Sequence, residues 1–114
     1  MTTETLTNYW VAVGQVEDIP RQGARVVATP MGDVALFRTL RDEVFALDDR
    51  CPHKGGPLSA GIVHGRSVTC PLHNWVIDLA SGEALAPDRG CVRRIPVRIE
   101  HGGVLLDLSG RRRS

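Results

Sequence analysis

The chain has 114 residues, and 14 Lys and Arg against 13 Asp and Glu leave a formal charge of +1. A chain of this length is expected to form one domain, and its near-neutral charge argues against a nucleic-acid binder or a polybasic membrane binder. Apolar residues at 42% and charged residues at 24% are ordinary for a globular protein, which argues against a disordered or fibrous chain.

The N-terminal residues predict a cytoplasmic protein. Residues 1–8 contain no basic segment, and no apolar segment with a small-residue cleavage site follows them. No apolar stretch approaches the roughly 20 residues that a membrane-spanning helix needs. We therefore expect no membrane association and a cytoplasmic location, where thiols stay reduced.

Short runs of β-branched and aromatic residues, separated by turn residues, continue through the whole chain. A hairpin is expected between the second and third runs, and Gly102 and Gly103 are expected at the turn of the last hairpin. Residues 19–22 are expected to form a single helical turn. The predicted strands span residues 9–16, 25–29, 34–40, 44–48, 67–69, 75–79, 92–100 and 104–108.

No segment keeps the apolar spacing of a helix for long, so the chain is predicted to be all-β. Many short strands with frequent turns are typical of an antiparallel β-sandwich or a small barrel. We place a single domain at residues 1–110 and a basic, solvated tail at residues 111–114.

Two Cys–His motifs stand out from this even pattern. The first is Cys51-Pro52-His53, and sixteen residues separate it from the second, Cys70-Pro71-Leu72-His73. A chain that folds back on itself would bring two thiolates and two imidazoles together. Zn²⁺ accepts such a set tetrahedrally, but a Cys and a His one residue apart are awkward ligands for a single tetrahedral ion. A [2Fe–2S] cluster with both Cys on one iron and both His on the other suits that spacing.

We therefore predict that Cys51 and Cys70 hold one iron and that His53 and His73 hold the other. From the residues alone, a structural zinc site remains the alternative. The sequence shows no nucleotide-binding glycine motif and no nucleophile–base pair, so no complete active site is expected in this chain.

Other residues around the motifs carry expectations of their own. Gly55, Gly56 and Gly61 are expected to adopt positive φ, which lets the backbone approach the cluster closely. Cys91 lies outside the four-ligand set and is expected to be a small buried residue.

The spacing C-x-H-x₁₆-C-x₂-H, with a Pro after each Cys, resembles the Rieske iron–sulfur signature. The resemblance implies a Rieske-like β-fold with a cluster-binding tip made of two loops, at about residues 50–76. Respiratory Rieske proteins have an extra cysteine in each loop and hydroxyl residues after the second His, and this chain has neither. We therefore expect a potential toward the low end of the Rieske range of roughly −150 to +300 mV.

The imidazole edges of His53 and His73 are expected to project at this tip, where electrons would enter or leave. Leu58, Pro71 and Leu72 are expected to form an apolar rim around them. A small apolar rim suits a transient redox interface.

Beyond the motif, the chain resembles the small subunit of assimilatory NAD(P)H-dependent nitrite reductase. The likeness is carried by residues 51–58, 61–63 and 70–77, and it continues through residues 82–84 and 90–93. It implies a cytoplasmic complex in which a large flavin and sirohaem subunit reduces nitrite to ammonia. In that complex this chain would be an electron-transfer subunit.

Two alternatives remain open. The first is a free Rieske ferredoxin that donates electrons to an aromatic-ring-hydroxylating dioxygenase. Those ferredoxins more often have Gly after the second ligand His, where this chain has Asn74. The second is a structural β-domain that binds zinc only for folding.

Overall fold

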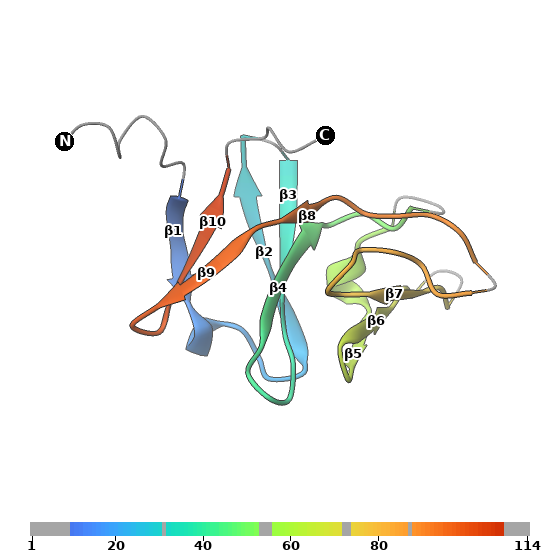
Figure 1. Cartoon of the computed structure of the whole chain (residues 1–114), viewed down its shortest axis with the longest axis horizontal. Helices are drawn as coiled ribbons and strands as arrows, with labels where there is room; N and C mark the ends of the chain where they lie inside the picture. Colours follow the sequence, from blue (N-terminus) through green and yellow to red (C-terminus); the bar gives the residue numbers. More distant parts are fainter. Residues whose placement is uncertain (1–9, 31, 53–55, 72–73, 87, 109–114) are drawn as a thin grey trace.

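The computed structural model describes residues 10–30, 32–52, 56–71, 74–86 and 88–108. In this part of the chain, ten strands form three antiparallel sheets, and there are two single-turn 3₁₀ helices (Figure 1). The predicted all-β, antiparallel fold is confirmed. The elements are β1 (Trp10–Gln15), η1 (Val16–Asp18), β2 (Gly23–Thr29), β3 (Gly32–Arg38), β4 (Val44–Asp48), η2 (Leu58–Ala60), β5 (Ile62–His64), β6 (Ser67–Thr69), β7 (Val76–Asp78), β8 (Arg94–Ile95), β9 (Val97–Glu100) and β10 (Gly103–Asp107).

The three sheets follow one another across the molecule, as Figure 1 shows from left to right. The outer sheet has the order β1-β10-β9, the central sheet β2-β3-β4-β8 and the loop sheet β5-β6-β7. The chain passes from the central to the outer sheet at Pro96, between β8 and β9. Because proline has no N–H to donate to a ladder, it suits this change of sheet.

Strand β3 is buried on both of its faces. Val34, Ala35, Leu36 and Phe37 are each 0% exposed. Successive side chains of a strand point to opposite faces. Val34 and Leu36 accordingly join a core that includes residues of β10, whereas Ala35 and Phe37 join a second core that includes residues of the loop sheet. The central sheet is therefore the layer on which both other sheets pack.

The predicted strands agree with the structure except in two places. Residues 62–64 form β5, a three-residue strand that pairs with β6 and was not predicted. It lies between Gly61 and Gly65. The predicted strand at residues 92–100 is divided by Pro96 into β8 and β9.

The predicted helical turn at residues 19–22 is wrong by a few residues. The turn is η1, at Val16–Asp18, and the carboxylate of Asp18 accepts a hydrogen bond from the N–H of Gln15 at 2.9 Å. This contact satisfies an amide at the start of the turn, as a capping residue does. Ile19 is buried in the core shared with the outer sheet.

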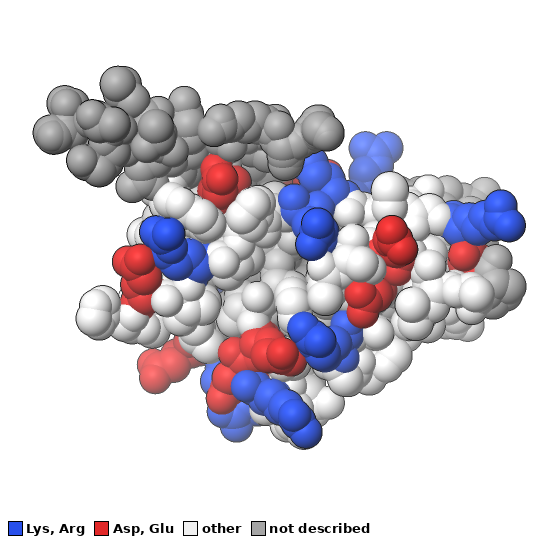
Figure 2. Space-filling view, viewed as in Figure 1, with Lys and Arg blue, Asp and Glu red and all other residues white. Residues whose placement is uncertain are grey.

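Charged residues of both signs are interspersed on the face in Figure 2, and the described residues of that face form no continuous patch of one sign. This distribution agrees with the net charge of +1. No helix within the described ranges is both long and apolar enough to cross a bilayer. The predicted tail at residues 111–114 lies outside those ranges, so the domain boundary stays a prediction.

Asp42 ties the turn after β3 to the segment around η1. Its carboxylate accepts hydrogen bonds from Arg21 at 3.0 Å and from Arg38 at 2.9 Å. Arg38 also donates to the carbonyl oxygens of Val16 and Ile19. The hydrogen bonds from Arg21 and then Arg38 hold the pKa of Asp42 below its usual value of 3.8. The ionised carboxylate is therefore the form that the fold favours.

We predict that Asp42→Asn lowers the free energy of unfolding at neutral pH and that this deficit disappears in acid. Because the pKa is lower in the folded state, the contribution of Asp42 is present above the unfolded pKa and is lost as pH falls through the folded pKa. Asn tolerates the positive φ of 66° at this position, so the substitution isolates the charge. Urea unfolding of both proteins from neutral pH to about pH 2 measures the effect. A constant difference across that range would contradict it, and Asp33→Asn is the control.

Candidate metal centre

The two Cys–His motifs lie on loops that are closed in the same way. The N–H of Cys51 donates to the carbonyl oxygen of Gly56, and the N–H of Cys70 donates to that of Trp75, both at 2.7 Å. Each cysteine is therefore bonded to the residue five positions later. One predicted histidine ligand falls inside each closed stretch, although His53 and His73 themselves lie outside the described residues. We call residues 51–56 loop 1 and residues 70–75 loop 2.

The two predicted cysteine ligands are buried in one core. Cys51 is 2% exposed and Cys70 is 0% exposed, and both belong to the apolar cluster that also contains Phe37 and Leu58. Neither forms a disulfide bond. The described residues contain no group of three or more metal-ligating side chains, which is expected when two of the four predicted ligands lie outside them. The structure thus places the two predicted ligands that it describes, Cys51 and Cys70, in the same core.

Gly61 controls the approach between the end of η2 and loop 2. A β-carbon at Gly61 would collide with the backbone oxygen of Thr69, the residue before Cys70. The next residue, Ile62, is paired with Thr69 in the β5–β6 ladder. The chain therefore leaves loop 1 and comes into backbone contact with the start of loop 2 within a few residues.

The predicted positive φ of the loop glycines is wrong within the described residues. Gly61 has φ −83°, and Gly56 is not among the positive-φ residues of the described ranges; Gly55 lies outside them. Gly61 is required for space rather than for its backbone angle. In the described part of loop 2, positive φ instead occurs at Asn74.

Asn74 follows the second predicted histidine and has φ 58°. Its N–H donates to the carbonyl oxygen of Cys70 at 3.1 Å, inside the closure of loop 2. Gly adopts this left-handed conformation without strain, and among other residues Asn is one of the few that adopt it readily. The backbone at this position therefore accepts either Asn or Gly.

A third segment, described at residues 82–86 and 88–92, comes close to both loops at Gly90. A β-carbon at Gly90 would be 3.1 Å from the β-carbon of Pro52 in loop 1 and 3.4 Å from Cζ3 of Trp75 in loop 2. Gly90 also has φ 151° and accepts a hydrogen bond from the N–H of Ala84 at 2.9 Å. The sequence marked residues 82–84 and 90–93 only because the family likeness continues through them. The approach of Gly90 to both loops depends on the tertiary fold.

Two burial predictions are wrong. Cys91 is exposed, whereas its neighbour Val92 is only 6% exposed. Adjacent side chains of extended chain point in opposite directions, so burial of Val92 turns Cys91 outward. Leu58 is 0% exposed because it starts η2 inside the core, and it cannot form part of a surface rim. Pro71 is exposed as predicted, and Leu72 lies outside the described residues.

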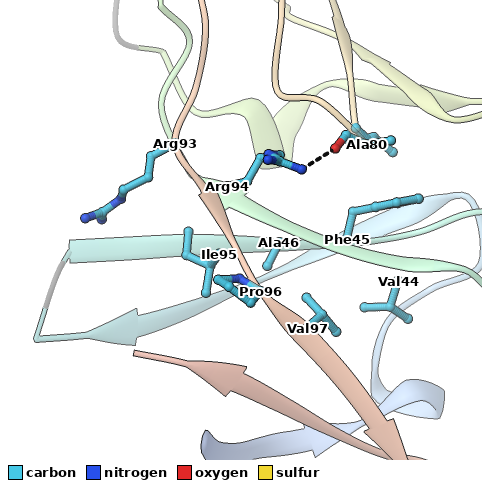
Figure 3. Close-up of a pocket in the computed structure, with 10 residues that line it drawn as sticks. Val44, Phe45, Ala46, Ala80, Arg93, Arg94, Ile95, Pro96 and Val97 are labelled. Carbon is cyan, nitrogen blue, oxygen red and sulfur yellow. Dashed lines mark hydrogen bonds between the residues drawn. The ribbon is translucent and has the colours of Figure 1, made fainter. Parts of the chain in front are cut away.

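A separate groove of about 520 Å³ lies between β4, the β8–β9 connection and the turn after β7 (Figure 3). Its two arginines are held by protein groups. Arg94 donates to the carbonyl oxygen of Ala80 at 2.9 Å, and Arg93 pairs with Asp48 at 2.7 Å. Neither Cys51 nor Cys70 lines this groove. It is therefore distinct from the two loops.

Comparison with known protein families matches residues 9–96 to the Rieske [2Fe-2S] domain. The chain belongs to the Rieske family. Its cofactor is accordingly a Rieske-type [2Fe–2S] cluster, which argues against the structural zinc alternative.

Several full-length relatives of this Rieske domain are known. It is 32% identical to the ferredoxin component of a naphthalene 1,2-dioxygenase system from Pseudomonas aeruginosa, over 91% of this chain and 100% of that protein. It is 35% identical to the anthranilate 1,2-dioxygenase ferredoxin subunit of Burkholderia cepacia, over 95% and 99%. A solved structure described as a "putative NADH-dependent nitrite reductase small subunit" from Mycobacterium tuberculosis aligns with a TM-score of 0.77 at 26% identity, over 85% of this chain and 92% of that chain.

The described residues fit this cofactor. Two unoxidised thiols lie in one dry core, and each stands at the base of a loop whose closing hydrogen bond encloses a histidine position. Thiolates and imidazoles are the ligands of a Rieske cluster. The fold thus places the two predicted cysteine ligands on two loops that the rest of the chain holds together.

We predict that Gly61→Ala destabilises the domain by about 1–3 kcal/mol, the usual cost of forcing a group into a packed site. The atom in its way is the backbone oxygen of Thr69, which moves only if β6 and the start of loop 2 move. Gly65→Asn is the matched control, because Gly65 has open space around it and a φ of 58° that Asn tolerates. Thermal unfolding and iron content measure the effect. Equal behaviour of the two variants would contradict the proposed close approach.

Proposed function

We propose that this chain is the Rieske electron-transfer subunit of an NAD(P)H-dependent nitrite reductase, with Cys51, His53, Cys70 and His73 as the cluster ligands. In this assignment the two thiolates hold one iron and the two imidazoles hold the other. The bound cluster supplies a one-electron redox couple, and because two neutral imidazoles replace two thiolates, its potential lies above that of a four-cysteine cluster.

The described residues exclude water from the thiolate side of the site. Cys51 and Cys70 lie in a core formed with the central and loop sheets, and their own amides hold the two loops closed. Gly90 lies against Pro52 and Trp75, so the chain at Gly90 supports both loops. A rigid, dry setting keeps the protein's rearrangement small when the charge of the site changes.

One observation carries the nitrite reductase assignment. The residues that extend the likeness beyond the ligand motif include Gly90, which lies near loop 2: a β-carbon there would be 3.4 Å from Cζ3 of Trp75. Cys91, next to Gly90, is exposed. The likeness therefore includes surface beside the two loops, where a redox partner would dock. The solved structure from Mycobacterium tuberculosis described as a "putative NADH-dependent nitrite reductase small subunit", with its TM-score of 0.77, supports this assignment.

The partner that follows is the large flavin and sirohaem subunit of the reductase, in the cytoplasm. A loop-end surface that mixes apolar and charged side chains suits a contact of modest area between redox proteins. Pro71, Leu85 and Arg89 are exposed on the segments that form this end.

A second function is favoured by the curated relatives. Ferredoxin components of naphthalene and anthranilate dioxygenase systems are 32% and 35% identical to this chain over essentially their whole length. The positive φ of Asn74 also weakens one argument against a ferredoxin, because Asn and Gly both meet that backbone requirement. A free Rieske ferredoxin that serves an oxygenase is therefore the competing proposal.

The ligand assignment predicts that His73→Ala abolishes the visible and EPR spectra of the cluster while the β-fold remains assembled. The strands and both cores are formed by residues outside loop 2, apart from Cys70 itself. Absorption, EPR and far-ultraviolet circular dichroism measure the outcome. His101→Asn is the control, because His101 lies in the exposed turn before β10 with φ 52°. An unchanged spectrum in His73→Ala would exclude His73 as a ligand.

The partner assignment predicts that the purified large subunit needs this chain to oxidise NAD(P)H in the presence of nitrite. His73→Ala should then fail to restore that rate, and His101→Asn should restore it. The same proteins are added in parallel to a dioxygenase whose own ferredoxin has been omitted. Support of aromatic hydroxylation without support of nitrite reduction would overturn the assignment in favour of the ferredoxin.

A further inference from the structure

Asp49 and Ser59 are joined by two hydrogen bonds around the outside of loop 1. The N–H of Ser59 donates to one carboxylate oxygen of Asp49 at 2.7 Å, and the Ser59 hydroxyl donates to the other at 2.9 Å. Both bonds are partly buried, and they join residues ten positions apart. They enclose the shorter closure between Cys51 and Gly56. Loop 1 is therefore held by two nested closures, one by backbone and one by a side chain.

Both ends of the outer closure are attached to rigid structure. The N–H of Asp49 donates to the carbonyl oxygen of Asp33 in β3 at 3.0 Å. Ser59 is the middle residue of η2, which packs against β2 and β3 and buries Leu58 completely. The two bonds therefore fasten the start and the return of loop 1 to the same central sheet.

The carboxylate has no competing ionic partner among the described residues, since none of their ion pairs includes Asp49. At η2, the N-cap residue Pro57 makes no side-chain capping bond. Asp49, from outside η2, thus accepts the N–H of Ser59 in the way that an N-cap side chain accepts an N–H in the first turn of a helix. Hydrogen bonds to a charged acceptor are stronger than neutral ones, so this contact suits a loop that must hold its shape.

We propose that Asp49 is a positioning residue: through Ser59 it fixes the span of loop 1 and so presets Cys51 for cluster binding. Loop 2 has a backbone closure of its own at Cys70, and the hydrogen bonds of Asp49 among the described residues go to Asp33 and Ser59. The role of Cys51 rests on the ligand assignment above. The effect of Asp49 on loop 1 does not rest on that assignment, because its hydrogen bonds are made within the protein and involve no cluster atom.

The test compares backbone amide exchange at Cys51 and Cys70 in the full chain as purified, read by mass spectrometry at single-residue resolution. Asp49→Asn should accelerate exchange at Cys51 at least tenfold and leave Cys70 within about twofold. Ser59→Ala, which keeps the backbone bond, should have a smaller effect of the same kind, and Ser59→Thr should restore protection. Asp33→Asn is the charge-matched control, because only its backbone contacts Asp49.

Equal acceleration of exchange at both amides would overturn the proposal, because it indicates general destabilisation. No acceleration at either amide would also overturn it, because the hydrogen bonds of Asp49 would then have no effect on loop 1. If Asp49→Asn does not fold, the milder Ser59→Ala decides by the same criterion. A second readout is the rate at which a chelator removes iron, which should rise at least threefold in Asp49→Asn. Faster exchange at Cys51 with an unchanged rate of iron loss would show that Asp49 holds loop 1 through Ser59, and it would count against Cys51 as a ligand.

Discussion

Closure of the two loops by the amides of their own cysteines is the constraint on which the rest of the site depends. Cys51 and Cys70 each use their backbone N–H to bond a carbonyl oxygen five residues away, so the thiol and the closure belong to the same residue. Any shift of either cysteine would open its loop and expose a buried thiol at once. Because unpaired buried polar groups are costly, the two thiols are held in place without help from a ligand.

This constraint works only because the core beneath it is continuous. β3 sends alternate side chains into the core shared with the outer sheet and into the core that holds both thiols, so one strand supports both sides. Gly61 then brings the chain leaving loop 1 against the backbone that enters loop 2, and Gly90 lies across Pro52 and Trp75. The three sheets thus serve as a base for one site at the loop end, while the groove beside Arg94 is a separate feature.

The sequence predicted the fold class, the main strands and the cofactor because each rests on local pattern: alternation, turn residues and a ligand spacing that suits two irons. It failed where the outcome depends on tertiary contact. Cys91 is exposed because Val92 takes the buried direction, and Leu58 is buried because η2 packs on the central sheet. Gly61 is needed for a contact with Thr69 that no local pattern reveals. The pairing of Asp49 with Ser59 likewise joins two ordinary polar residues ten positions apart.

The central claim is that one cluster binds two histidines, one from each closed loop. Pulsed EPR of the reduced protein, with ¹⁵N incorporated only into histidine, tests it most directly. We expect couplings to two directly bound histidine nitrogens, loss of the whole cluster signal in a His53 or a His73 variant, and both couplings retained when His64 or His101 is replaced. Absence of directly bound histidine nitrogen, or couplings that survive replacement of both His53 and His73, would contradict it.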